Sequence, residues 1–238
     1  ASQRQAAKNG RRDATVDFGT NPCSEIILRP YQFCNLSEVV VRPEDTLNTL
    51  KEKVKTAAIL GTLQATLTNF RYLRKIWQDN TEEEALLGVS LTGIMDHPIM
   101  SGRKKQAELK QWLTELKEEA IKTNKEWAER LGINVSTAIT AVKPSGTVSQ
   151  LVDSASGIHP RYSEQYVRRV RADARDPLCG VLEAAGVPVE DDVMSATTKV
   201  FSFPVKSPKD AIVATDMGAM EQLKLWEIYQ DYWCEHKP

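Results

Sequence analysis

The chain has 238 residues, 41% hydrophobic and 26% charged, which is the composition of a globular protein that buries one large core. Its 31 basic and 32 acidic side chains give a net charge of -1, which argues against a nucleic-acid duplex or an anionic membrane as a partner. No apolar stretch is long enough to cross a bilayer, and residues 1–17 do not resemble a signal peptide, so we expect a cytoplasmic protein.

The first half of the chain predicts one long helix and a buried segment. Residues 1–20 lack apolar periodicity and are expected to be extended or looped. Residues 45–77 carry apolar side chains every three or four positions, as in an amphipathic helix, with a break or bend at Gly61. Residues 88–100 are small and apolar and end in a predicted turn at Asp96-His97-Pro98.

The middle of the chain predicts a helix, a strand and a tight turn. Residues 104–131 have one apolar face and form a second long helix that stops at Gly132. The β-branched run 136–142 predicts a buried strand, and it ends at Lys143-Pro144-Ser145-Gly146-Thr147, where a turn and then a helix are expected.

The last third predicts two strands and two helices. Residues 166–170 and 198–205 are typical of strands, and they are separated by a short helix near 178–185 that Gly186 ends. A final helix is predicted over 219–233. Because helices and strands alternate along the chain, we expect an α/β fold with mainly parallel strand pairing.

The cysteines and histidines limit the possible metal and redox chemistry. The cysteines are too few and too dispersed for a disulfide scaffold and form no CxxC zinc pattern. They are Cys23, Cys34, Cys179 and Cys234. Each histidine lies within two residues of a following proline, which favours loops rather than a shared metal site. They are His97, His159 and His236. Any cysteine chemistry is therefore expected to be catalytic, without a bound metal.

Asn21, Cys23 and Glu25 form the first candidate site. They occupy alternate positions, so in an extended or loop backbone their side chains project the same way. A carboxylate raises the pKa of a neighbouring thiol and disfavours the thiolate, so this pair suits hydrogen-atom abstraction better than ionic attack. The carboxylate can then take a hydroxyl proton from the substrate. The alternative is an ordinary turn, because Asn-Pro is a common way to open one.

The turn at residues 143–149 is the second candidate site. It follows a predicted strand and opens a predicted helix, where free backbone N–H groups favour an anion such as a substrate phosphate. It is not a Walker P-loop, because the glycine spacing and the terminal GK[ST] are absent. As a bare pattern, a strand that ends in PSGT is also compatible with a simple turn.

Several separated segments resemble one enzyme family. GTNPCSEIIL, residues 19–28, resembles the finger-loop motif of ribonucleotide reductases. QFCNLSEVVV, residues 32–41, resembles the segment of adenosylcobalamin-dependent reductases that supplies one redox cysteine. The segments 156–163 and 166–171 resemble the monomeric adenosylcobalamin-dependent ribonucleoside-triphosphate reductases, and 229–238 also resembles the family. The resemblance implies the second half of a ten-stranded α/β barrel, with a finger loop at about residues 19–36 that threads its centre. Residues 1–238 would then form a partial catalytic domain that lacks the family's N-terminal half and C-terminal tail.

The resemblance also implies residue roles. Cys23 would become the thiyl radical that abstracts the ribose 3′ hydrogen, Glu25 would act as base on the 3′ hydroxyl, and Asn21 would hold the departing 2′ hydroxyl. Cys34 would belong to the redox pair, with its partner in the absent N-terminal half; without the resemblance, Cys34 is simply a small buried hydrophobe. The implied polyphosphate contacts are Pro144, Ser145, Gly146, Thr147 and Ser149.

The implied reaction is reduction of ribonucleoside triphosphates to 2′-deoxy forms, with adenosylcobalamin as cofactor, a thioredoxin-like reductant, and a nucleotide effector bound outside this chain. The fragment alone is expected to be inactive. Two alternatives stay open: a reductase that uses diphosphates or a metal radical initiator, and a non-catalytic α/β nucleotide-binding module. Four further residues are expected to have no direct catalytic role, Arg168, Arg169 and Arg171 on a solvated strand and His159 in a turn, and Cys234 is expected to be structural.

Overall fold

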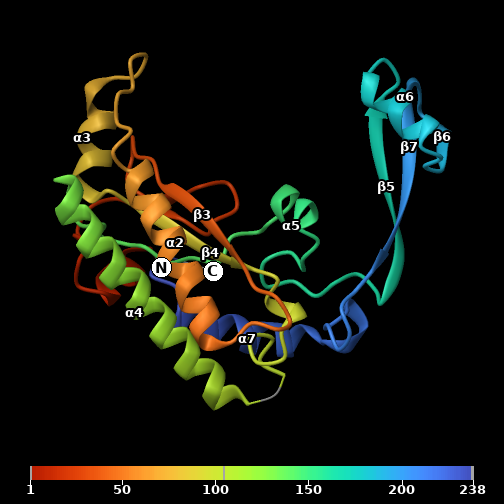
Figure 1. Ribbon diagram of the computed structural model, residues 1–238. Coiled ribbons are helices and arrows are strands. Elements are labelled where there is room, and N and C mark those ends of the chain that lie inside the picture. The colour runs from red at the N-terminus through yellow and green to blue at the C-terminus, as the bar shows by residue number, and fades with distance from the viewer. Residues whose placement is uncertain (1, 104, 237–238) are drawn as a thin grey trace.

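The computed structural model describes residues 2–103 and 105–236. Its elements in chain order are α1 (Ser2–Lys8), β1 (Gly19–Thr20), β2 (Ile27–Leu28), β3 (Asn35–Val40), α2 (Leu47–Gln64), α3 (Lys75–Glu84), β4 (Leu87–Thr92), η1 (Ile94–Asp96), α4 (Gln106–Leu131), α5 (Thr147–Leu151), β5 (Gln165–Asp173), α6 (Pro177–Ala184), β6 (Val189–Asp192), β7 (Ser195–Lys206), η2 (Ala214–Asp216) and α7 (Ala219–Tyr232). A body of helices around β3 and β4 carries a long arm made of β5, β6, β7 and α6 (Figure 1).

The body contains parallel strands with helices packed against them. β3 pairs in parallel with β4, from Asn35 opposite Leu87 to Val40 opposite Thr92, and every residue of β4 is buried. The predicted strand 136–142 lies along the other edge of β4, where the N–H of Val89 donates to the carbonyl of Ile139 at 2.8 Å. It makes one parallel bridge, Val89 to Thr140, rather than a regular strand. This parallel part agrees with the expected α/β class.

Helix α2 covers this sheet and α4 packs against α2, because each helix has one apolar face. The buried positions of α2 recur every three or four residues: Leu50, Val54, Ala57, Ala58, Gly61 and Thr62. The prediction of one helix over 45–77 is wrong, since α2 ends at Gln64 and α3 begins at Lys75. Gly61 does not break α2; it lets the helix approach Leu87, whose side chain would lie 3.1 Å from an added Cβ. The chain leaves the helix instead at a polar, threonine-containing stretch, where side chains compete for the backbone hydrogen bonds.

The N-terminal prediction is also wrong, because Ser2–Lys8 forms helix α1. Gln5 explains its position: its side-chain amide donates to the carbonyls of Cys234 and His236, at 3.3 and 2.8 Å. This partner segment is more than 220 residues away, so local periodicity gave no sign of it. The predicted helix 104–131 is confirmed as α4 from Gln106, with Gly132 in the left-handed conformation at its end; Lys104 lies outside the described residues.

The arm is antiparallel, which contradicts the expectation of mainly parallel pairing. Its strands lie in the order β5, β7, β6, and both pairings are antiparallel. The chain turns directly from β6 into β7 without the helical crossover that a parallel neighbour requires. Three arginines of β5 are exposed, as predicted: Arg168, Arg169 and Arg171. The arm extends away from the helical body (Figure 1). Among the described residues, no helix is long and apolar enough to cross a membrane.

Gly93 is expected to be sensitive to substitution. It has φ +80°, and an added Cβ would clash with the backbone carbonyl oxygen of Val41. We expect Gly93→Ala to lower the free energy of unfolding by about 1–3 kcal/mol in urea titrations, because the added Cβ meets a backbone oxygen, which cannot move aside as a flexible side chain can. Gly132→Ala is the control: it has φ +67° but nothing within 4 Å of the added Cβ. An equal loss in both variants would show that the contact with Val41 is unimportant.

Candidate functional site

The finger loop is a short hairpin whose tip is closed by Asn21. β1 and β2 pair antiparallel, and residues 21–26 form the tip between them. The Asn21 side-chain oxygen accepts a hydrogen bond from the Ile26 N–H at 3.0 Å, and its carbonyl accepts one from the Ser24 N–H at 2.9 Å. Ser24 adopts φ +66° to make the turn. Asn21 thereby sets the direction in which Cys23 and Glu25 project.

Cys23 is exposed at the tip and faces a cavity of about 300 Å³. Three surfaces meet here: the end of the 136–142 segment, the segment that carries His159, and helix α7. The other lining residues are Val142, Lys143, Pro144, Ile158, His159, Gln222, Leu223 and Trp226. His159 is exposed and lies 3.3 Å from the Ser156 carbonyl, which fits the expected turn histidine held by a local hydrogen bond. The volume is at the lower end of that of small-molecule sites.

Glu25 turns inward from the loop tip and pairs with Lys143. It is 1% exposed, and its Oε1 lies 2.8 Å from the Lys143 ammonium. Burial on its own would raise the pKa of Glu25. The hydrogen bonds from Lys143, from the backbone of Glu25 and from Asn21, together with the charge of Lys143, outweigh burial, so the pKa lies below its ordinary value. The same bond raises the pKa of Lys143. Glu25 is therefore a charged carboxylate held two residues from an exposed thiol.

Cys34 lies just before β3, partly buried behind the finger loop. Its sulfur packs near Gly88 of β4, where an added Cβ would lie 3.4 Å from Sγ. Burial raises the pKa of Cys34, so the side chain is a neutral thiol. The charge of Glu25 also raises this pKa, whereas the charge of Lys143 lowers it. All four cysteines are free thiols in the described part of the chain.

The turn predicted to hold phosphate borders a second cavity, of about 590 Å³. The Ser145 hydroxyl donates to Glu38 of β3 at 2.9 Å and accepts from the Ser149 N–H at 3.1 Å. Ser149 is fully buried, and its hydroxyl donates to the Ser145 carbonyl at 2.6 Å. These two serines therefore shape the turn, while Gly146 and Thr147 are exposed. The helix that follows, α5, has only 5 residues.

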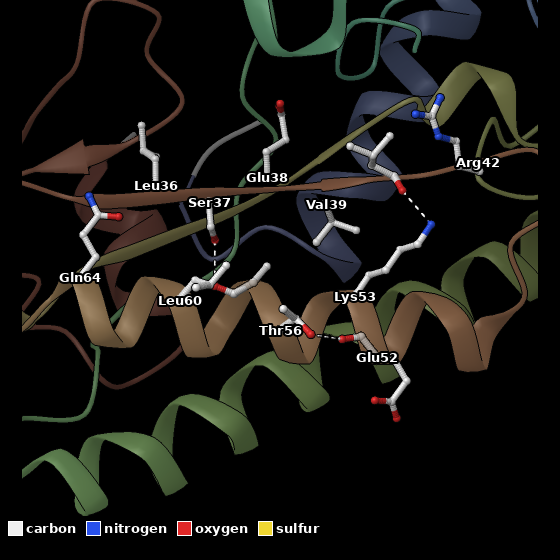
Figure 2. Close-up of a pocket in the computed structure, with 12 residues that line it drawn as sticks. Leu36, Ser37, Glu38, Val39, Arg42, Glu52, Lys53, Thr56, Leu60 and Gln64 are labelled. Atoms are coloured by element: carbon white, nitrogen blue, oxygen red, sulfur yellow. Dashed lines mark hydrogen bonds between the residues drawn. The ribbon is translucent and has the colours of Figure 1, made fainter. Parts of the chain in front are cut away.

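Glu38 is a site residue that sequence analysis missed. Burial raises its pKa, although the Ser145 hydroxyl and Lys143 act in the opposite direction. Figure 2 shows Glu38 on the opposite side of β3 from Ser37 and Val39, which face helix α2. This alternation follows from the two-residue period of a strand. The same figure draws the residues that line another cavity, between β3 and α2. Its volume is about 720 Å³, and it shares Leu36, Ser37 and Glu38 with the cavity beside the turn.

A buried ion pair fixes the segment that carries His159. The Arg161 guanidinium binds Asp96 through two hydrogen bonds, of 2.8 and 2.9 Å, and also donates to Asp153 at 2.9 Å. These contacts raise the pKa of Arg161 even though burial opposes them. The bidentate geometry holds residues 156–161 against the end of β4, so that Ile158 and His159 form one wall of the Cys23 cavity.

A second buried cluster anchors the base of the finger loop. Arg12 donates to both carboxylate oxygens of Glu84, each at 2.8 Å, and to the Ile27 carbonyl at 2.8 Å. Gln32 completes the cluster by donating to Glu84 at 2.5 Å. Burial would raise the pKa of Glu84, but Arg12 and Gln32 lower it overall. The cluster ties β2 and the chain before Cys34 to the end of α3.

We expect Arg12→Met to lower the free energy of unfolding by about 3–5 kcal/mol at pH 7, because it removes the bidentate cation of the buried Glu84. Of the cations in the described part of the chain, only Arg29, whose Nε lies 3.4 Å from the carboxylate, then remains beside it. In the wild type, the lowered pKa of Glu84 gives stability that is present above the unfolded-state pKa and is lost as the pH falls. The difference between variant and wild type should therefore shrink in acid. Lys75→Met, in an exposed pair with Asp79, should change stability by less than about 1 kcal/mol. A pH-independent loss in Arg12→Met would contradict this electrostatic explanation.

The structure brings the two predicted sites together through Lys143 and Pro144, which line both cavities. The sequence did not predict that Lys143 pairs with Glu25, or that α7 forms one wall of the cavity beside Cys23. Cys234 is fully buried, in agreement with the expected structural role.

No protein-family model matches the chain. The adenosylcobalamin-dependent ribonucleoside-triphosphate reductase of Lacticaseibacillus paracasei is 30% identical over 96% of this chain and 34% of its own length. A probable adenosylcobalamin-dependent ribonucleoside-triphosphate reductase of Dictyostelium discoideum is 30% identical over 92% of this chain and 28% of its own length.

Two solved structures give the fold. A crystal structure of a B12-dependent (class II) ribonucleotide reductase superposes with a TM-score of 0.79 at 26% identity, over 94% of this chain and 35% of that one. The α subunit of the class Id ribonucleotide reductase of Actinobacillus ureae superposes with a TM-score of 0.55 at 14% identity, over 92% of this chain and 46% of that one, which shows the fold alone.

These matches first define a class: the chain has part of the α/β barrel of ribonucleotide reductases. Within that class, it is homologous to the adenosylcobalamin-dependent ribonucleoside-triphosphate reductases over most of its own length. The chain spans about a third of the length of the curated relatives that it matches.

Proposed function

We propose that this chain supplies the ribose-reducing site of an adenosylcobalamin-dependent ribonucleoside-triphosphate reductase, which makes 2′-deoxyribonucleoside triphosphates for DNA synthesis. The observation that carries the proposal is the exposed Cys23 thiol, two residues from the ionised Glu25, beside a cavity that borders the 143–147 turn. A non-catalytic nucleotide-binding module has no need of a charged carboxylate buried beside an exposed thiol.

Each residue of the site has its own role in the proposed reaction. Cys23, as a thiyl radical, takes the 3′ hydrogen atom: the C–H bond breaks and an S–H bond forms. Glu25 accepts the proton of the 3′ hydroxyl, and Asn21 holds the 2′ hydroxyl, which leaves as water. The two electrons and two protons that this reduction consumes come from Cys34 and a second thiol outside the described residues. Gly146 and Thr147 hold the polyphosphate, while Pro144, Ser145 and Ser149 keep the turn in shape.

The described residues leave Cys23 accessible to adenosylcobalamin but do not enclose the cofactor. The cavity beside Cys23 is about 300 Å³, which is too small to enclose a corrin, so the described residues do not form a complete cofactor site. The exposed position of Cys23 does leave its sulfur open to a large group. When bound, the cofactor supplies radical initiation. The part of this chain is to present Cys23 and to hold the sugar.

The partners follow from the same chemistry. A thioredoxin-like protein would restore the Cys34 thiol, which is neutral because burial raises its pKa. A nucleotide effector would bind outside this chain. We further propose a cytoplasmic location, because the reaction requires reduced cysteines and a reducing compartment maintains them.

The test is a nucleotide-reduction assay on the complete enzyme that contains this chain. Ribonucleoside tri- and diphosphates are supplied with adenosylcobalamin, or with iron or manganese under air, and deoxynucleotides are quantified. We expect product from triphosphates with adenosylcobalamin alone. Product only from diphosphates or only with a metal would place the protein in another branch. Nucleotide binding without reduction under every condition would favour the binding module.

A further inference from the structure

Lys143 lies between the two parts of the candidate site. It lines both the cavity beside Cys23 and the cavity beside the 143–147 turn. Its backbone N–H donates to the Ser90 hydroxyl of β4 at 2.8 Å, and Pro144 follows it directly. The side chain is about a third exposed, whereas the Glu25 side chain is 1% exposed. Lys143 thus places its positive charge beside the buried carboxylate of Glu25, and its backbone is fixed by the hydrogen bond to Ser90.

The two carboxylate oxygens of Glu25 have different surroundings. Oε1 accepts from the Lys143 ammonium at 2.8 Å. Oε2 is buried, and no donor among the described residues hydrogen bonds to it. Buried polar atoms without a partner are rare because they have lost their hydrogen bonds to water. Glu25 is not among the residues that line the two cavities, so a substrate hydroxyl supplies the missing donor only when the bound substrate opens a path to Oε2.

The backbone of Glu25 and the side chain of Asn21 also lower the pKa of Glu25, but neither carries a charge. Cys23 and Glu38 raise the pKa of Lys143. A third titratable neighbour is Cys34, whose pKa is raised by the charge of Glu25 and lowered by that of Lys143. A thiol or a carboxyl adds no positive charge. Lys143 is the cation whose hydrogen bond and charge lower the pKa of Glu25.

We propose that Lys143 is the positioning residue of this site: it clamps Oε1 of Glu25, keeps the carboxylate charged, and leaves Oε2 to receive the proton of a substrate hydroxyl. In this step the O–H bond of the substrate breaks and an O–H bond forms on Oε2, with no oxidant or reductant. The role in catalysis rests on the proposed function, but the clamp itself does not.

The clamp is tested by ¹³C NMR titration of the intact chain labelled at glutamate and aspartate carboxyl carbons, with the Glu25 signal assigned by its loss in Glu25→Gln. In the wild type, we expect Glu25 to titrate below the ordinary value of about 4.3. In Lys143→Met, its pKa should rise by about one to three units, the usual effect of an opposite charge at this range. Lys143→Arg should restore most of the shift.

Lys53→Met is the matched control. Lys53 pairs at 2.6 Å with Asp45, and the exposures of the two side chains are close to those of Lys143 and Glu25. Lys53 lines the cavity between β3 and α2, and it lines neither the cavity beside Cys23 nor the one beside the 143–147 turn. This variant should raise the pKa of Asp45 and leave Glu25 unchanged. The clamp is overturned if the pKa of Glu25 has its ordinary value in the wild type, or if it is the same in the wild type and in Lys143→Met. If Lys143→Met does not fold, the wild-type pKa of Glu25 still tests the clamp.

Reduction by the complete enzyme tests the second half of the proposal separately. In Lys143→Met, the acid limb of the kcat profile should move to higher pH by the same amount as the Glu25 titration, and Lys143→Arg should move it back. If the NMR shift occurs and the acid limb stays in place, the clamp stands but its catalytic purpose is overturned. If no reduction is seen in the wild type either, the proposed function fails while the NMR result still decides the clamp.

Discussion

Replacing Cys23 by serine in the complete enzyme should abolish nucleotide reduction, with a fall in kcat on the order of a thousandfold or more, as for the loss of an essential reacting group. Serine has nearly the same shape, but its O–H bond is too strong for the hydroxyl to replace a thiol in hydrogen-atom transfer. Because Cys23 is exposed at a loop tip, the change should leave stability and nucleotide affinity almost unaltered. The measurements are kcat for deoxynucleotide formation and the Kd of the triphosphate.

Cys179→Ser is the control for this variant. Cys179 is buried in the arm, where its thiol donates to the Asp173 carbonyl at 3.2 Å, and a serine hydroxyl can make the same bond. Reduction should continue in this control. Full activity in Cys23→Ser would remove the thiyl mechanism and leave the loop as an ordinary hairpin.

Glu25→Gln should lower kcat by about 10²–10⁴-fold, the usual contribution of a general base. Glutamine keeps the size of the side chain and an oxygen that can accept from Lys143, so the loop should keep its shape. In the wild type, the lowered pKa of Glu25 keeps the base ionised, and activity is lost only as the pH falls through that lowered value. The residual activity of Glu25→Gln should therefore lack this acid limb.

Glu115→Gln provides the comparison, since Glu115 pairs with Lys51 at 2.5 Å on the surface of α4, away from both cavities. Its kcat and pH profile should match the wild type. An unchanged kcat in Glu25→Gln, with the triphosphate still bound, would show that another group removes the hydroxyl proton.

Much of the local structure could be predicted because it depends on neighbours in the sequence. The apolar stripe of α4 and the glycine after it placed that helix to within two residues at each end. Helices α6 and α7 and the arm strands β5 and β7 were predicted for the same reason. The alternation of Asn21, Cys23 and Glu25, together with the resemblance it carries, located the loop that bears the thiol.

Several of the errors have a different origin, because they involve a partner far along the chain. Helix α1 is held by the C-terminal segment through Gln5, and α2 passes through Gly61 because Leu87 packs against it. The segment 136–142 was expected as a full strand, but it meets β4 at one bridge only. Strand direction in the arm depended on how the chain returns after β6, which strand propensity does not encode.

For the site, the sequence by itself determined which chemical groups are present: a thiol, a carboxylate and a turn that contains serine, glycine and threonine. Only the tertiary structure decided how these groups act on one another. It placed Lys143 against a residue 118 positions earlier and buried that carboxylate against one ammonium. Ionisation depends on burial and on charges within a few ångströms, and these are set by the packing of distant segments rather than by neighbours in the sequence.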